Sequence, residues 1–131
     1  MTEQAITPAQ IAAMVDAFYA YIRSHPRLGP IFEARLAGKW DLHHDKLKAF
    51  WRSVLLTSGE YNGRPVPVHA AISELQSADF ALWLAAFEGT VRSVFNPDQA
   101  EFVMGKARRI ARSLWLARFG SASSTPPDWA A

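Results

Sequence analysis

Residues 77–95 read SADFALWLAAFEGTVRSVF, and this stretch decides the fold class. Its large apolar residues recur at spacings of three and four, and it contains no proline. This spacing places them on one wide face of an α-helix, whereas a half-buried strand would alternate apolar and polar residues. We therefore expect a long helix that has Ser77 as its N-cap and buries the face carrying Phe80, Trp83, Leu84 and Phe87.

The same spacing continues on both sides of this stretch. Eight prolines leave proline-free windows at residues 31–64, 68–96 and 98–125, and each window carries apolar residues three and four apart. Cap and stop signals predict further helices from Thr7 to about 25, 30 to 36, Asp41 to about 57, 67 to 75, and Asn96 to Gly120. In the last helix we expect Phe102, Val103, Ile110 and Leu114 to face inward. The sequence thus predicts one all-α domain over residues 1–120 and a flexible tail over 121–131.

Composition excludes several kinds of site. The 131 residues include no cysteine, which excludes disulfides, iron–sulfur clusters, zinc sites with cysteine ligands and thiolate-ligated or thioether-linked haem. The sequence also lacks the Gly-x-Ser-x-Gly, His-Glu-x-x-His and Walker motifs of common hydrolases and nucleotidases. Residues 1–10 do not resemble a secretory signal, and no apolar run could span a membrane, so we expect a cytoplasmic protein without membrane binding.

His69 is the first candidate for a metal ligand. The Asn62-Gly63 turn, Pro65 and Pro67 restrict the backbone before it, and Ala70 and Ala71 leave space beside its ring. A restricted approach with small neighbours suits an imidazole that binds a metal. A half-buried histidine that makes one ordinary hydrogen bond would give the same pattern, so the residues alone leave both interpretations open.

Three further polar side chains lie on or beside apolar helix faces. The apolar direction of the helix that follows Asp41 falls nearly midway between His43 and His44, so periodicity does not choose between these two imidazoles. Tyr19 and Trp83 are large rings with one polar atom each, and that atom needs a partner when the ring is buried. Each of these residues is either a binding residue or a core residue with a satisfied polar atom.

Taken together, these residues resemble the truncated haemoglobins, the short two-over-two helical globins, and within them the third group. The resemblance covers about residues 8 to 119. Paired-glycine motifs of the other truncated-globin groups are absent, as is usual in the third group. The matching strings are Phe18-Tyr19, Leu28-Gly29-Pro30-Ile31-Phe32, His43 seven residues before Phe50-Trp51, Tyr61-Asn62-Gly63-x-Pro65 leading to His69, and Trp83-Leu84 followed by Phe87.

The resemblance implies a two-over-two helical sandwich that encloses haem b. It makes His69 the proximal ligand of the haem iron, and it makes Tyr19, Trp83 and His43, rather than His44, the residues of the distal side. The resemblance also implies further residues that line the haem pocket, including a basic side chain that reaches a haem propionate. These pocket residues are Phe18, Phe32, Leu47 and Lys46, with Arg64 as a second basic candidate.

The resemblance also implies a function. An iron with one imidazole ligand keeps its sixth position open to O₂, CO, NO or peroxide. Hydrogen bonds from Tyr19 and Trp83 would slow O₂ release, which suits a carrier poorly and favours redox chemistry on oxygen, peroxide or NO with an external reductase. Peroxidase-like or NO dioxygenase-like turnover is left undecided. We expect a monomer or a weak dimer.

A different class of function remains as an alternative. Lys106, Arg108, Arg109 and Arg112 recur at helical spacing and could form the basic face of a small helical nucleic-acid-binding domain. The formal net charge of +2 is too small to favour this by itself. We therefore expect no nucleic-acid partner.

The proximal assignment predicts the effect of removing one imidazole. His69→Ala should lose haem or hold it weakly, because His69 is the only protein bond to iron that the resemblance implies. His25→Ala and His44→Ala should keep it. Haem content and the reduced absorption spectrum of the purified proteins measure this. Full haem content with an unchanged spectrum in His69→Ala would show that the proximal ligand lies elsewhere.

Overall fold

The computed structural model describes residues 5–59 and 76–120, and the helices in these ranges confirm the predicted all-α class. No strand occurs among them. The helix expected at about 67 to 75 and the tail at 121–131 lie outside the described residues. The helices are α1 (Pro8–Ser24), α2 (Leu28–Leu36), α3 (Trp40–Leu56), α5 (Ser77–Val94) and α6 (Pro97–Phe119).

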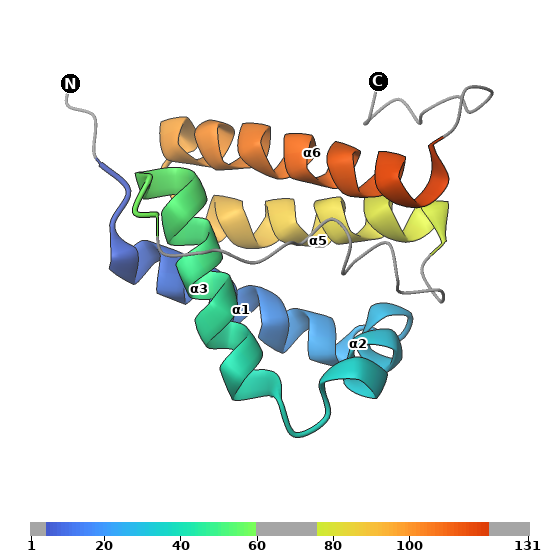
Figure 1. Cartoon of the computed structure of the whole chain (residues 1–131). Helices are drawn as coiled ribbons and strands as arrows, with labels where there is room; N and C mark the ends of the chain where they lie inside the picture. The colour runs from blue at the N-terminus through green and yellow to red at the C-terminus, as the bar shows by residue number, and fades with distance from the viewer. Residues whose placement is uncertain (1–4, 60–75, 121–131) are drawn as a thin grey trace.

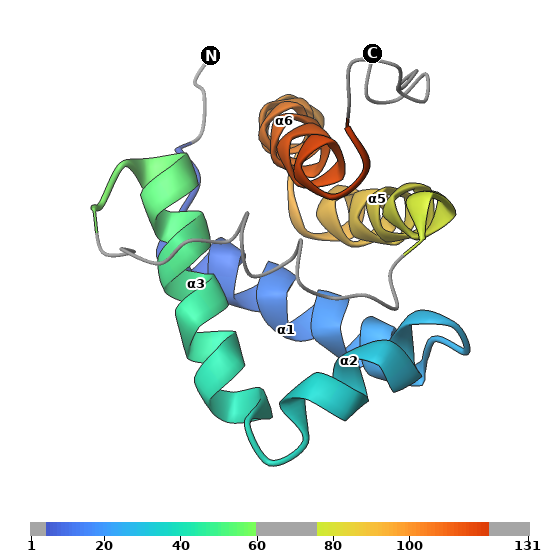
Figure 2. The ribbon, with the colours of Figure 1, turned by 45° about the vertical axis from the view of Figure 1, so that its right-hand side comes forward.

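The helices form two layers of two, as the two-over-two arrangement requires. In Figure 1, α5 and α6 form an antiparallel pair, and α1 and α3 cross one another on the other side. Figure 2 shows the same layers after a rotation, with α2 at the end of α1. Helix α1 packs against α5 as well as α3 and α2, so it joins the layers. The crossing of α1 and α3 leaves an angle that faces the α5–α6 pair.

Two predicted helix starts are confirmed in atomic detail. The Gln10 N–H donates to Thr7 Oγ1 (3.1 Å) and the Thr7 N–H donates to Gln10 Oε1 (3.0 Å), which is a complete capping box. Asn96 and Gln99 form the same box at the start of α6. The Gln10 amide also donates to Gln99 Oε1 (3.1 Å). The two boxes therefore tie the first and last helices together.

Two other predicted caps are wrong. Helix α5 is capped by Gln76 rather than Ser77, and the Ser77 hydroxyl accepts a hydrogen bond from the Trp115 indole (2.7 Å). Helix α3 begins at Trp40, and its N-cap is Lys39. Asp41 therefore lies in the first turn, where its negative charge interacts favourably with the helix dipole. In both cases a residue that could cap the helix stands within two positions of the observed cap but does not cap it.

The core confirms most of the predicted inward positions, with one exception on α6. Val103 and Leu114 are buried, whereas Phe102 is 48% exposed. Phe102 precedes Val103 by one residue, which turns it by about 100° from the inward face. Its ring lies instead 5.4 Å from the Lys106 ammonium, in a cation–π contact on the surface.

Asp79 connects the start of α5 to the turn between α1 and α2. Its carboxylate accepts two hydrogen bonds from the Arg27 guanidinium (3.0 and 2.8 Å) and one from the Gln76 N–H (2.8 Å). The side chain is 4% exposed. The hydrogen bonds from Arg27 hold the pKa of this carboxyl below its usual range.

This arrangement predicts a specific loss of stability. Asp79→Ala should lower the free energy of unfolding by about 1–2 kcal/mol, because it removes the acceptor that completes the capping box with Gln76 and that pairs with Arg27. Because the folded-state pKa of Asp79 is lowered, its contribution is complete above the ordinary carboxyl pKa of about 3.9 and disappears as the pH falls through the folded-state value. Urea unfolding of both proteins at neutral pH and at pH 3 measures the difference.

An exposed ion pair supplies the control for this prediction. Glu101 accepts a 2.8 Å hydrogen bond from Arg92 but is 63% exposed, so Glu101→Ala should change the free energy of unfolding much less. Equal effects of the two changes would contradict a special role for the buried carboxylate.

Candidate functional site

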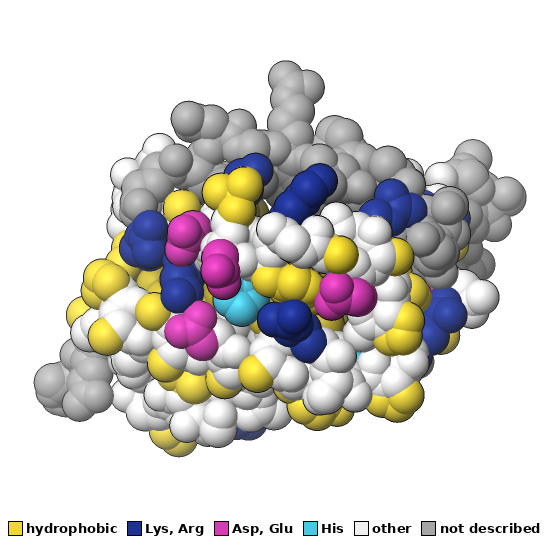
Figure 3. Space-filling model, turned by 90° about the horizontal axis from the view of Figure 1, so that it is seen from below, with side chains coloured by type: hydrophobic (Ala, Val, Ile, Leu, Met, Phe, Trp, Pro, Cys, Tyr) yellow, Lys and Arg dark blue, Asp and Glu magenta, His cyan; other side chains and the backbone are white. Residues whose placement is uncertain are grey.

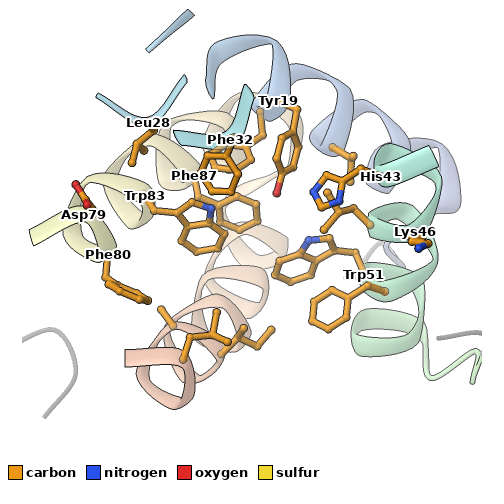
Figure 4. A pocket seen from close by; sticks show the side chains of 17 residues that line it. Tyr19, Leu28, Phe32, His43, Lys46, Trp51, Asp79, Phe80, Trp83 and Phe87 are labelled. Atoms are coloured by element: carbon orange, nitrogen blue, oxygen red, sulfur yellow. The ribbon is translucent and has the colours of Figure 1, made fainter. Parts of the chain in front are cut away.

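A cavity of about 260 Å³ lies between the two helix layers. Every helix of the described chain contributes to its lining. His69 and Arg64 lie outside the described residues, so their positions are not given. The predicted site residues within the described chain all line this cavity, as Figure 4 shows in part: Phe18, Tyr19, Phe32, His43, Lys46, Leu47 and Trp83.

Stacked and edge-on rings form the wall of the cavity next to α5. Phe18 meets Trp83 and Phe87 edge-on, with ring centroids 5.5 and 5.1 Å apart. Phe87 is stacked between Trp83 (5.0 Å, 8°) and Trp51 (5.2 Å, 19°). Aromatic rings in these geometries attract one another beyond the burial of their area. The result is a stiff apolar wall suited to a large flat ligand.

Two hydrogen-bond donors lie in this apolar setting. Figure 4 shows the Tyr19 oxygen directed into the middle of the cavity, with His43 on one side and Trp83 on the other. Burial raises the pKa of the Tyr19 phenol above its ordinary value, which keeps the hydroxyl protonated. Within the described chain, neither this hydroxyl nor the Trp83 indole N–H has a hydrogen-bond partner.

The structure separates the two adjacent histidines. His43 lines the cavity, and its ring centroid lies 5.6 Å from that of Tyr19. His44 does not line it, and its Nδ1 lies 3.8 Å from an Asp16 carboxylate oxygen. The same oxygen accepts from the Lys48 ammonium at 3.0 Å. The crossing of α3 over α1 thus turns one imidazole toward the cavity and the other toward α1.

Charged groups mark two ends of the cavity. Figure 4 shows Lys46 at one end and Asp79 at the opposite end. Asp79 is neutralised by Arg27, as described above, whereas the structure gives Lys46 no ion pair within the described residues. The ammonium of Lys46 is therefore placed to meet an anionic group at the edge of a ligand.

Similarity to known proteins identifies the family of this chain. No protein-family model matches the chain. The group 3 truncated hemoglobin ctb of Campylobacter jejuni is 31% identical over 114 residues, covering 85% of this chain and 90% of that protein. The chain belongs to the group III truncated haemoglobins. A crystal structure of group III truncated hemoglobin from Campylobacter jejuni superposes with a TM-score of 0.83 at 27% identity, covering 95% of this chain and 99% of that one.

Membership of this family implies a haem, and the described cavity has the chemistry that a haem needs. The aromatic wall suits the faces of a porphyrin, and Lys46 offers a positive charge at one edge. The Tyr19 hydroxyl and the Trp83 indole N–H add two hydrogen-bond donors to the lining, and neither has a partner among the described residues. Within residues 5–59 and 76–120, no helix of this truncated haemoglobin is long and apolar enough to cross a membrane.

The sequence did not predict Asp79 or nine apolar residues as part of the cavity lining. Asp79 was not singled out, although Gln76 and Asp79 have the spacing of a capping box, because glutamine is not among the residues that usually cap helices. Although Leu28, Phe50, Trp51 and Phe87 stand in the strings that carry the family resemblance, the sequence predicts none of the remaining lining residues as part of the pocket, because apolar periodicity cannot distinguish a packed face from a cavity wall. They are Val15, Leu28, Phe50, Trp51, Phe80, Phe87, Ile110, Ala111 and Leu114.

Proposed function

We propose that this truncated haemoglobin binds haem b with His69 as the proximal ligand, and that Tyr19, Trp83 and His43 form a polar distal side. The observation that carries the proposal is the pair of donors, Tyr19 O–H and Trp83 N–H, directed at one apolar cavity without protein partners in the described chain. When bound, the haem supplies an iron with an open position for O₂, CO or NO.

The distal residues discriminate among diatomic ligands by charge. Tyr19 and Trp83 donate hydrogen bonds to a ligand that carries partial negative charge, as O₂ does, and they gain less from neutral CO. The aromatic wall around Phe18 and Phe87 excludes water, so these bonds meet little competition. The raised pKa of Tyr19 keeps its proton available at neutral and mildly alkaline pH.

Tight retention of O₂ favours redox chemistry over bulk transport. A hydrogen bond to a charged group is worth about 1.5–3 kcal/mol, so two such bonds slow release by orders of magnitude. The Tyr19 hydroxyl also offers a hydrogen bond to oxygen, peroxide or NO that would react in this site. We propose that the electrons for such turnover come from a separate reductase and that the protein acts in the cytoplasm as a monomer or weak dimer.

No specific observation supports the alternative of a nucleic-acid-binding domain. Arg108 lies 3.9 Å from Glu88, which neutralises part of the proposed basic face, and the Lys106 ammonium lies over the Phe102 ring. We therefore retain the haem proposal alone.

The role of Lys46 is tested by reversing its charge. Lys46→Glu should weaken haem retention, because a carboxylate at the cavity edge repels a propionate. Lys48→Glu is the matched control: it makes the same change two residues away, where the ammonium faces Asp16 instead of the cavity. Transfer of haem to an excess of apomyoglobin measures retention. Identical transfer rates for the two variants would exclude Lys46 as a propionate partner.

The distal donors are tested by removing one polar atom at a time. Tyr19→Phe and Trp83→Phe should each speed O₂ dissociation about tenfold or more, since each removes a bond worth about 1.5–3 kcal/mol and keeps most of the ring. CO dissociation should change much less, and His43→Leu should affect O₂ release less than either. Stopped-flow ligand replacement gives these rates.

Tyr21→Phe is the control for the phenol, because Tyr21 is 50% exposed and does not line the cavity. It should release O₂ at the wild-type rate. If Tyr19→Phe and Trp83→Phe do so too, the polar distal side is wrong and only the haem-binding part of the proposal survives.

A further inference from the structure

The orientation of the Tyr19 ring needs a structural cause. Its hydroxyl makes no hydrogen bond within the described chain, so the ring is held by packing alone, and the second side-chain torsion of a tyrosine has broad energy wells. Phe18 (5.1 Å) and His43 (5.6 Å) meet the ring edge-on. Trp40 (6.4 Å, 59°) and His44 (5.4 Å, 49°), both on α3, lie against it at tilted angles.

Trp40 has a polar anchor of its own. Its indole N–H donates to Glu33 Oε1 on α2 at 3.0 Å, and the Arg23 guanidinium of α1 lies 4.5 Å from its ring centroid. Arg23 also approaches Glu33 at 4.0 Å. The Trp40 side chain is buried at 6% exposure, and it contacts residues of three helices at one corner of the molecule.

The neighbouring imidazole is anchored less firmly. His44 Nδ1 lies 3.8 Å from Asp16, beyond ordinary hydrogen-bond length, and its Nε2 is buried without a hydrogen-bond partner in the described residues. The ring of His44 meets Trp40 edge-on at 6.1 Å. Figure 3 shows the molecule from below, with a histidine side chain surrounded by acidic and basic side chains on the visible face. Trp40 thus supports both His44 and Tyr19.

We propose that Trp40 is a positioning residue for Tyr19, and that its hydrogen bond to Glu33 holds the phenol with its hydroxyl in the cavity. The proposal rests on the proposed function in one respect, namely that the Tyr19 hydroxyl is a distal donor. Trp40 does not line the cavity, so it acts through Tyr19 and makes no contact with a ligand. The contacts of Trp40 between α1, α2 and α3 thereby determine the orientation of the Tyr19 hydroxyl in the cavity.

The hydrogen bond can be removed from either end with small changes of shape. Trp40→Phe keeps an aromatic ring and deletes the donor, whereas Glu33→Leu keeps the donor and deletes the acceptor. Glu33→Gln keeps an acceptor oxygen and should restore the arrangement. Glu101→Leu serves as the control, because Glu101 is also an exposed carboxylate (63%, against 52% for Glu33) and pairs with Arg92 rather than with Trp40.

A double-mutant cycle on O₂ dissociation from the haem-loaded protein tests the route of action. Trp40→Phe should speed release about threefold to tenfold, a part of the loss caused by Tyr19→Phe. In the Tyr19→Phe background the same change should have no further effect, because there is no hydroxyl left to aim. An equal effect of Trp40→Phe in both backgrounds would overturn the proposal. A Tyr19→Phe rate equal to wild type would instead refute the donor role itself.

A second measurement does not depend on ligand release. The chain has three tyrosines, so selective ¹³C labelling of tyrosine rings gives a simple NMR spectrum of the CO-bound protein, and Tyr19 is assigned by its loss in Tyr19→Phe. Glu33→Leu should move the Tyr19 ring signal, and Glu33→Gln should return it close to the wild-type position. Glu101→Leu should leave it unchanged. A Tyr19 signal that is the same in Glu33→Leu as in wild type would show that this anchor does not position the phenol.

Discussion

The site depends on the packing of Phe18, which is 1% exposed and lies where the two helix layers meet. Its ring contacts Tyr19 on its own helix and both Trp83 and Phe87 on α5, each edge-on. These contacts hold α1 and α5 together and also fix the wall against which a flat ligand would lie. Loss of this ring would therefore loosen the fold and the cavity at once.

Around this apolar centre, polar groups are few and each has a defined position. Asp79 is held by Arg27 and completes the capping box of α5 with Gln76 at one end of the cavity. Lys46 marks the other end. Tyr19 and Trp83 keep their donors directed into an apolar space, which is costly for folding and useful for binding a polar ligand. In the proposed function, this cost in stability keeps two donors available to a haem-bound ligand.

Local signals predicted the fold well where they were complete. The boxes of Thr7 with Gln10 and Asn96 with Gln99 each join two residues three apart, so sequence alone locates those helix starts. The prediction failed at Ser77, whose hydroxyl is used by Trp115 from another helix. It failed at Phe102 because one position of rotation on a helix separates a buried ring from an exposed one. The first error comes from a contact with another helix and the second from the rotation of α6 toward the core, and the local pattern contains neither.

The sequence by itself determined the helical class and, through the family resemblance, the two helix layers and part of the cavity lining, which includes Phe18, Tyr19 and Trp83. Helix periodicity left His43 and His44 undecided, because adjacent residues on a helix differ by about 100° and the apolar face lay midway between them. The family resemblance favoured His43, and the tertiary structure shows that His43 lines the cavity and His44 does not. The tertiary structure alone revealed Arg27 with Asp79 and Trp40 with Glu33. Such pairs join different helices, and their formation depends on how those helices cross, which no spacing along the chain encodes.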